Sequence, residues 1–239
     1  MNYAHRGYKK EYPENTLLSI RKAIVSGANG IEIDVHLSKD GELVVIHDED
    51  VNRTFEGIGL VRDYTLEELK EFKNRDERED GDCSIPTLQE VFNIVKPYKL
   101  PILIELKTDM IQYEGIEEAV IQLIKQNDYM EHSAIMGFNW DTIKKCRELD
   151  PDVRLGLSKH DKFNLDILDK AKEIDIQMLT LNYDILSPDI MVTLRDLGYE
   201  INVYTVNRKH DMKKMMDYEV HRIITDDPEL LVSLLKEHE

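Results

Sequence analysis

The alternation of strand-like and helix-like segments restricts the fold of this sequence more than any other feature. Eight short apolar segments are each followed by a segment whose apolar residues recur at helical spacing. The strand candidates are residues 2–6, 31–36, 102–106, 133–138, 154–158, 178–182, 201–206 and 222–225. The helix candidates are residues 17–28, 86–95, 115–126, 140–149, 165–173, 188–197, 209–218 and 228–236. Strict alternation of this kind predicts an α/β protein with a parallel sheet.

The number of units favours a closed barrel over an open sheet. Eight strand–helix units in 239 residues match the size of a (β/α)8 TIM barrel, which typically has about 250 residues. The alternative is an open doubly wound sheet, which usually has fewer strands. No Gly-rich dinucleotide fingerprint follows any strand candidate. We therefore predict one TIM-barrel domain over residues 1–239.

One segment interrupts the alternation. Residues 49–85, after the second strand, are polar and punctuated by glycines. They contain one amphipathic helix candidate, residues 65–73, and a charge run at 73–82 that is typical of a solvated loop. We interpret this segment as a small insertion in the barrel.

The composition excludes some classes of function. The chain has 48 acidic and 31 basic residues, for a formal net charge of −17. This charge argues against nucleic-acid binding and against docking on anionic membranes. A phosphorylated substrate is not excluded, because a local cation can invert the field in a cleft.

The same sequence indicates the cytoplasm. No apolar run approaches the roughly 20 residues of a membrane span, and residues 1–5 do not resemble a secretion signal. Cys83 and Cys146 lie far apart in sequence. Two reduced thiols are favoured over a disulfide in such a protein.

Polar side chains gather at the predicted ends of the first three strands. Glu32 and Asp34 alternate with Ile31, Ile33 and Val35, so both carboxylates lie on one face of the second strand. On the third strand Glu105 and Lys107 share a face. The first strand ends in His5 and Arg6, and the apolar run 43–46 returns His47 to the same neighbourhood. Active sites of TIM barrels lie at these strand ends.

The three carboxylates are candidate metal ligands. Glu32, Asp34 and Glu105 are hard oxygen donors, with neither a cysteine nor a zinc-type histidine cluster beside them. This set favours one Mg²⁺ or Ca²⁺ ion. The alternative is a buried ion-pair network of the three carboxylates with Arg6 and Lys107.

The two histidines are suited to proton transfer near neutral pH. His5 and His47 each stand at a strand end beside carboxylates, where general acid–base chemistry is expected. Arg6 and Lys107 are natural partners of a phosphate group. The remaining histidines lack such neighbours in sequence, and we interpret them as surface or packing residues: His36, His132, His160, His210, His221 and His238.

Nine short motifs then stand in a fixed order along the chain. They are HRG at 5–7, PENT at 13–16, IEIDV at 31–35, KDG at 39–41, HD at 47–48, PTL at 86–88, IELK at 104–107, TVN at 205–207 and ITDDP at 224–228. With these motifs the chain resembles the glycerophosphodiester phosphodiesterases, which are related to the phosphatidylinositol-specific phospholipase C-like phosphodiesterases. The resemblance covers essentially the whole chain. Residues 49–85 resemble the insertion of that family.

The resemblance implies a metal-dependent hydrolase that releases glycerol 3-phosphate and an alcohol from glycerophosphodiesters. By this resemblance His5 and His47 look like the acid–base pair, and a cyclic phosphate forms before water opens it. We expect His5 to be the base of the first step, although the resemblance leaves the assignment open. It also implies that Glu32, Asp34 and Glu105 bind the metal, and that Arg6 and Lys107 contact phosphate.

Two positions depart from the family's pattern. Tyr204 stands where the family usually has Trp, and Gly137-Phe138 stands where it commonly has Ser-Phe. Tyr204 and Phe138 are candidates for the glycerol or alcohol side of the pocket, with core packing as the alternative. Glu14 and Asn15 are candidates for orienting the site, and helix capping is the alternative for Asn15.

Two other functions remain open at this stage. One is a lysophospholipase D-type activity on monoacylated lipids. It requires an apolar entrance, for which the insertion offers Val51, Phe55, Ile58, Leu60 and Val61. The other is a non-catalytic phosphoester-binding barrel, for which the loss of a histidine or carboxylate would be typical. The oligomeric state is not predicted by the sequence.

Overall fold

Eight parallel strands form a closed barrel. The computed structural model describes residues 1–76, 78, 79, 81–161 and 166–238. The strands pair in the order β1-β9-β8-β7-β6-β5-β4-β2, and pairing of β2 with β1 closes the ring. They are β1 (Asn2–His5), β2 (Gly30–Leu37), β4 (Ile102–Leu106), β5 (Ser133–Gly137), β6 (Leu155–Lys159), β7 (Met178–Asn182), β8 (Glu200–Tyr204) and β9 (Arg222–Thr225). The predicted TIM barrel is confirmed.

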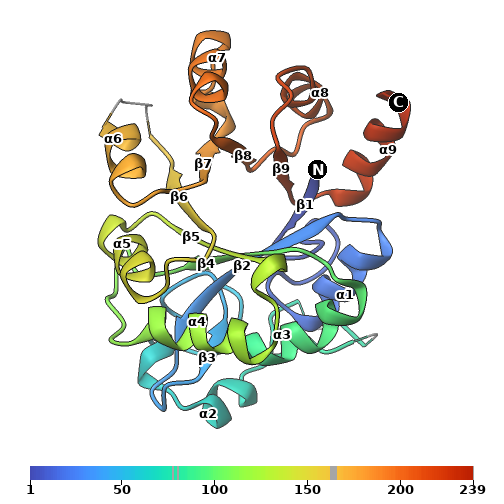
Figure 1. The fold of residues 1–239 in the computed structure, drawn as a ribbon. Coiled ribbons are helices and arrows are strands. Elements are labelled where there is room, and N and C mark those ends of the chain that lie inside the picture. Colours follow the sequence, from blue (N-terminus) through green and yellow to red (C-terminus); the bar gives the residue numbers. More distant parts are fainter. Residues whose placement is uncertain (77, 80, 162–165, 239) are drawn as a thin grey trace.

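A helix follows each barrel strand, and Figure 1 shows these helices arranged around the strands. They are α1 (Leu17–Val25), α3 (Leu88–Val95), α4 (Ile116–Gln126), α5 (Trp140–Leu149), α6 (Asp166–Glu173), α7 (Pro188–Asp196), α8 (Lys209–Asp217) and α9 (Pro228–His238). Their bounds lie close to the predicted ones. Residue 165, the predicted start of the sixth helix, lies outside the described residues.

The two faces of the strands bury different side chains. On β2 the apolar residues Ile31, Ile33 and Val35 face outward into the core shared with the helices, where all three are fully buried. The barrel interior contains a smaller cluster of Tyr3, Leu103, Ala134, Met136, Met178 and Ile224. A Cβ on Gly30 would lie 2.4 Å from the Tyr3 ring, so glycine is needed there for the ring to fill the barrel. The barrel is therefore a packed core beneath its open end.

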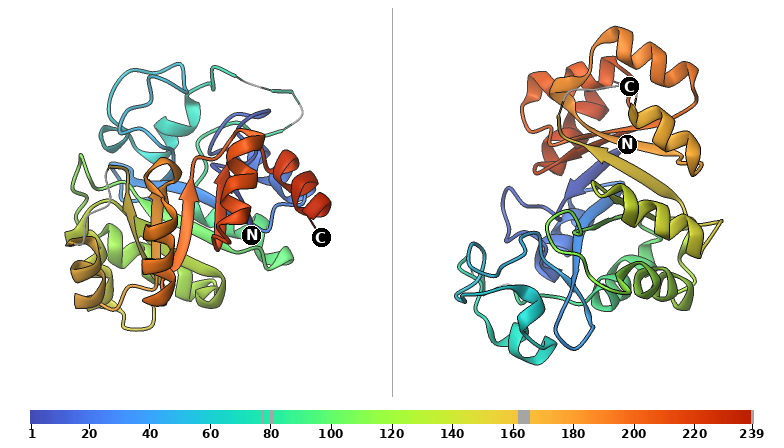
Figure 2. Two further views of the ribbon diagram at one scale, coloured as in Figure 1. Left: turned by 90° about the horizontal axis from the view of Figure 1, so that it is seen from above. Right: turned by 90° about the vertical axis from the view of Figure 1, so that its left-hand side faces the viewer.

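A hairpin extends β2 beyond the barrel. The short strand β3 (Leu43–Val45) runs antiparallel to β2, with Val45 opposite Val35. The predicted return of the chain toward His47 is therefore confirmed. After the hairpin comes the segment 49–85, which contains α2 (Leu66–Glu71). Figure 2 shows this segment projecting from one side of the barrel.

The projecting segment has its own apolar cluster. Its members, together with residues of the hairpin, are Val44, Ile46, Val51, Phe55, Val61, Leu69 and Ile85. Three of the five apolar residues considered for a lipid entrance, Val51, Phe55 and Val61, are at most 3% exposed in this cluster. Ile58 is 82% exposed. The segment thus uses most of these side chains to stabilise itself rather than to form an apolar surface.

Two further findings concern the chain as a whole. Among the described residues, no helix combines the length and apolar character needed to cross a membrane. Cys83 and Cys146 are both buried, and the predicted preference for two thiols over a disulfide agrees with the structure.

Candidate active site

Three buried carboxylates lie together at the open end of the barrel. Glu32 and Asp34 come from β2, and Asp34 is paired in register with Glu105 of the neighbouring strand β4. One oxygen from each of the three lies within 4.8 Å of the others. The residues are 2%, 1% and 8% exposed, respectively. The clustering predicted from strand alternation is thus present in the structure.

The ion-pair network considered as an alternative is also present, but it is incomplete. Lys107 Nζ lies 2.8 Å from Glu105 Oε1, and Arg6 Nε lies 3.3 Å from Asp34 Oδ2. Glu32 accepts a 3.2 Å hydrogen bond from the Arg6 backbone, and its nearest cationic candidate is His5 Nε2 at 4.0 Å. Burial, together with the nearby charges of Asp34 and Glu105, raises the pKa of Glu32 well above its usual range. Arg6 therefore compensates the charge of Glu32 only in part.

The same cluster fits a divalent cation. Asp34 Oδ1 is buried without a hydrogen-bond partner among the described residues. The cavity lined by Glu32 and Glu105 has a volume of about 20 Å³, enough for one water-sized particle. A hard cation would supply both the partner for Asp34 and the charge that Glu32 lacks. The residues present fit a divalent cation better than they fit an ion-pair network alone.

His5 forms part of a hydrogen-bonded chain that runs from the buried histidine to the exposed Asn207. Its Nδ1 lies 2.6 Å from Asp226 Oδ1, and Asn207 Nδ2 donates a 2.7 Å hydrogen bond to Asp226 Oδ2. A carboxylate at Nδ1 holds the proton there and leaves Nε2 as the basic nitrogen. Burial lowers the pKa of His5 despite this hydrogen bond, so the ring is neutral near pH 7. The predicted strand 201–206 ends at Tyr204, and the loop that follows places Asn207 against Asp226.

His47 forms a second histidine–aspartate pair nearer to solvent. Its Nδ1 lies 2.6 Å from Asp48 Oδ1, and its Nε2 lies 3.4 Å from Lys107 Nζ. The His47 side chain is 30% exposed, against 10% for His5. His36, predicted to be a packing residue, is fully buried, and its Nε2 lies 3.1 Å from the His47 carbonyl oxygen.

Arg53 links the projecting segment to this pair. Its guanidinium donates to Asp48 Oδ2 at 2.6 Å and to both oxygens of Glu14, at 2.6 and 3.0 Å. Glu14 in turn accepts a 2.8 Å hydrogen bond from Arg6 Nη1. These arginines lower the pKa of Glu14 to about 2 although burial opposes its ionisation. One carboxylate thus orients the arginine of the HRG motif and anchors the segment that carries Arg53.

The two candidate roles of Asn15 are resolved by its contacts. Thr16, not Asn15, is the N-cap of α1 and forms a capping box with Ser19. Asn15 Nδ2 instead donates a 2.9 Å hydrogen bond to Asp34 Oδ2. The capping interpretation of Asn15 is therefore wrong, because its amide is used to orient a carboxylate.

Aromatic side chains lie on the other side of the cavity. Tyr204 lines it together with His5, Glu32 and Glu105. Phe138 packs edge-to-face against Tyr204, with ring centroids 6.1 Å apart. Both positions identified from the sequence thus lie at or next to the cavity, and Tyr204 also joins the cluster inside the barrel.

The sequence predicts most residues of this site but not the residues that contact them from outside. His5, Arg6, Glu32, Asp34, His47, Glu105 and Lys107 are linked to one another by the contacts described above. Asp48, Asp226, Asn207 and Arg53 were not identified as site residues. The signal was available for three of them, since Asp48, Asn207 and Asp226 lie within the HD, TVN and ITDDP motifs.

Comparison with known proteins decides the family. The model of the glycerophosphoryl diester phosphodiesterase family matches residues 5–230. This chain belongs to that family. A glycerophosphodiester phosphodiesterase of Caldanaerobacter subterraneus subsp. tengcongensis is 38% identical over 98% of this chain and 96% of its own length. The family and the enzyme class predicted from the sequence are both confirmed.

Solved structures of family members have the same fold. The glycerophosphodiester phosphodiesterase of Thermotoga maritima is 32% identical, covers 98% of this chain and 97% of its own, and superposes with a TM-score of 0.80. A phosphodiesterase of Oleispira antarctica, solved with the product sn-glycerol-3-phosphate, is 25% identical over 99% of this chain and 96% of its own, with a TM-score of 0.86.

Proposed function

We propose that this enzyme hydrolyses glycerophosphodiesters to glycerol 3-phosphate and an alcohol. The observation that carries the proposal is the position of two histidine–aspartate pairs beside the buried carboxylates at the barrel mouth. The product bound to the Oleispira antarctica relative supports the substrate class. The buried apolar residues of segment 49–85 make an activity on monoacylated lipids the less supported alternative.

The two histidines transfer protons in opposite directions. His5 Nε2 removes the proton from the glycerol hydroxyl next to the phosphoester, and that oxygen attacks phosphorus. His47 gives a proton to the departing alcohol oxygen, and a cyclic phosphate remains. In the second step His47 accepts a proton from water, and His5 returns one to the glycerol oxygen as the ring opens. His5 is the better first base because burial keeps it neutral.

The charged side chains hold the phosphate and a cation. Glu32, Asp34 and Glu105 would hold one Mg²⁺ or Ca²⁺ ion, with Asn15 orienting Asp34. Such an ion neutralises charge on the phosphoryl oxygens and lowers the pKa of an oxygen nucleophile. Arg6 and Lys107 contact the phosphate oxygens, and their carboxylate partners fix the direction of both cationic groups.

The proposal also covers the cellular compartment in which the enzyme works. We propose a cytoplasmic enzyme that acts on small diesters, and its two buried free cysteines support a reducing environment.

The test is the release of glycerol 3-phosphate from glycerophosphocholine and glycerophosphoethanolamine. The assay is run with EDTA and then with Mg²⁺, Ca²⁺ or Mn²⁺ restored. We expect turnover to be lost with EDTA and regained with at least one ion. No turnover with any ion, in protein shown to be folded by circular dichroism, would contradict the proposed function. Undiminished turnover in EDTA would contradict the metal site alone.

A further inference from the structure

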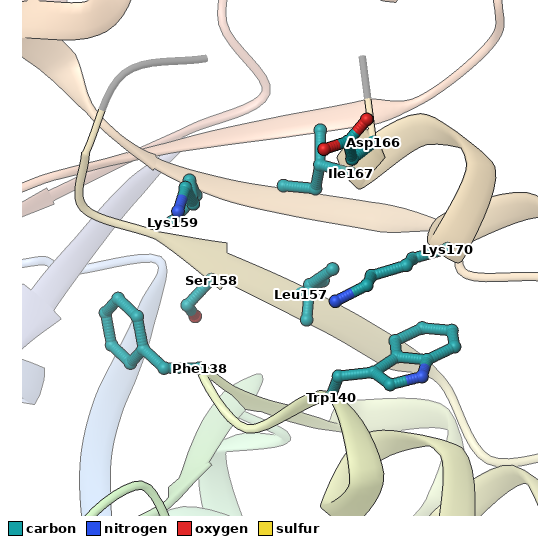
Figure 3. Close-up of a pocket in the computed structure, with 8 residues that line it drawn as sticks. All are labelled: Phe138, Trp140, Leu157, Ser158, Lys159, Asp166, Ile167 and Lys170. Atoms are coloured by element: carbon teal, nitrogen blue, oxygen red, sulfur yellow. The ribbon is translucent and has the colours of Figure 1, made fainter. Parts of the chain in front are cut away.

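A second pocket opens beside the catalytic cavity, between the ends of β5 and β6 and helices α5 and α6. It has a volume of about 200 Å³, against about 20 Å³ for the cavity at the carboxylates. Figure 3 shows the side chains of both strands and both helices around this space. Its lining includes Phe138, Trp140, Ser158, Lys159, Asp166 and Lys170. The space is large enough for a small organic group.

Two residues connect this pocket to the reaction centre. Ser158 lines the pocket and also the cavity that contains His5, Glu32 and Glu105. Phe138 lines the pocket and packs against Tyr204, which lines the cavity. A diester whose phosphate lies at the carboxylates therefore has the pocket next to it.

The hydroxyl of Ser158 indicates that something polar binds here. The residue is 3% exposed, and its Oγ has no hydrogen-bond partner among the described residues. Buried hydroxyls are nearly always paired. An unpaired hydroxyl on a residue that lines both cavities is therefore suited to bind a polar atom of a ligand. Thr180, also in the cavity lining, does have partners in Met136 and Asn202.

The charges of the pocket favour an anion. Lys159 and Lys170 both line it, and no ion pair of either lysine is found among the described residues. Lys170 Nζ lies 5.7 Å from the centre of the Trp140 ring, above its face. Asp166 also lines the pocket and offsets one of the two positive charges. In a chain of net charge −17, a pocket beside the active site whose described lining carries a net positive charge requires an explanation.

We propose that this pocket is the subsite for the alcohol part of the diester, and that it favours an alcohol carrying a carboxylate or phosphate group. Phe138 and Trp140 provide apolar walls for the carbon skeleton, and Ser158 provides a hydrogen-bonding group at the phosphate end. Lys159 and Lys170 attract the anionic group of the alcohol. This proposal rests on the proposed function, because it assigns the part of the same substrate that departs.

The experiment compares matched diesters. Serine differs from ethanolamine by one carboxylate, so glycerophosphoserine and glycerophosphoethanolamine form one pair. Glycerophosphoinositol 4-phosphate and glycerophosphoinositol form the second pair, which differs by one phosphate. kcat/KM is measured for all four with wild type, Lys159→Met, Lys170→Met and the double variant. Lys236→Met, an exposed lysine on α9, is the control.

Wild type should prefer the anionic member of at least one pair, about three- to tenfold in kcat/KM for two partly exposed cations. The double variant should lose that preference, because its kcat/KM should fall more for the anionic member than for the neutral member, and the control variant should behave like wild type. The pair that shows the preference identifies carboxylate or phosphate as the recognised group. If wild type has the same kcat/KM for the anionic and the neutral member of both pairs, or if the double variant keeps the wild-type preference, the proposed subsite is wrong. Normal turnover of the neutral diesters would still support the proposed function in that case. Failure to turn over any of the four would overturn both.

Discussion

The barrel mouth has two halves of different chemistry. The ends of β1, β2, β4 and β9 carry charged groups in a continuous set of contacts, from Asp226 through His5 and the carboxylates to Lys107. The ends of β5, β6 and β8 carry Phe138, Ser158, Lys159 and Tyr204, with an edge-to-face ring contact and few polar bonds. The first can be called the charged half and the second the aromatic half.

The two halves differ in the task for which their contacts are suited. In the charged half each side chain is oriented by at least one partner, as chemistry on a phosphoryl group requires. In the aromatic half the contacts are less directional, and the hydroxyl of Ser158 has no hydrogen-bond partner among the described residues. Changes in the charged half should therefore lower kcat. Changes in the aromatic half should alter KM and the choice of substrate.

The largest effect is expected from the histidines. His5→Ala or His47→Ala should lower kcat by about 10²- to 10⁴-fold, because each removes one proton-transfer group. His210→Ala, on the exposed surface of α8, is the matched control and should keep wild-type activity. The measurement is steady-state release of glycerol 3-phosphate, with circular dichroism to verify folding. Near-normal kcat in either site variant would refute its assigned role.

Substitution of the Glu32 carboxylate should change stability and activity in opposite directions. Glu32 has a raised pKa in the fold, so its ionised form opposes folding, and this cost appears as pH rises above the ordinary Glu value of about 4.5. Glu32→Gln removes the charge. In EDTA at pH 7 the variant should be more stable than wild type, because it lacks this cost. Its turnover should fall about 10²-fold with any ion, since a ligand is lost.

Thermal unfolding in EDTA and with added Mg²⁺ or Ca²⁺ measures the stability part of that prediction, and release of glycerol 3-phosphate measures the turnover part. Wild type should gain stability from at least one ion, and the gain should be much smaller in Glu32→Gln. A variant that is less stable than wild type in EDTA would mean that the ion-pair network, not a cation, determines the need for this carboxylate.

Arg53 tests whether the charged half depends on the projecting segment. Arg53→Ala removes the hydrogen bonds to Asp48 and Glu14 and should lower kcat about 10- to 100-fold. It should also displace the pH dependence of kcat, because Asp48 then holds His47 less firmly. Arg53→Lys should restore part of the activity. Arg62→Ala, an exposed arginine of the same segment, should have no effect. An unchanged pH profile in Arg53→Ala would leave Arg53 with a structural role only.

The charged half was largely predictable because local rules apply to it. Glu32, Asp34 and Glu105 follow from the two-residue period of strands that are adjacent in the barrel, and His5 follows from its place at a strand end. The partners of the histidines were less accessible. Asp226 forms a hydrogen bond with His5, which lies 221 residues away in sequence. Arg53 donates hydrogen bonds to Asp48 and Glu14 from an irregular segment. No local period encodes such contacts.

For the aromatic half, the sequence predicts two alternatives, pocket lining or core packing, and does not decide between them. A Phe or Tyr at a strand end is equally suited to a core and to a pocket, and Tyr204 in fact contacts both. Lys159, Ser158 and Trp140 gave no signal in the sequence, because their role depends on how α6 packs beside β6. Similarly, Asn15 and Thr16 are both good helix caps, and only the position of Asp34 decides between them.

The smallest effect is expected from the ring contact of the aromatic half. Phe138→Leu removes the edge-to-face contact with Tyr204, which is worth about 0.5–1.5 kcal/mol beyond its buried area. KM should rise about two- to tenfold while kcat stays within twofold, because the charged half is untouched. Tyr204→Phe is the matched control, since it keeps the ring and removes the hydroxyl that lies 3.4 Å from His160 Nδ1. It should change KM less than twofold. A fall in kcat as large as that of the histidine variants would mean that the aromatic half positions the reacting groups, and the division of tasks between the two halves would fail.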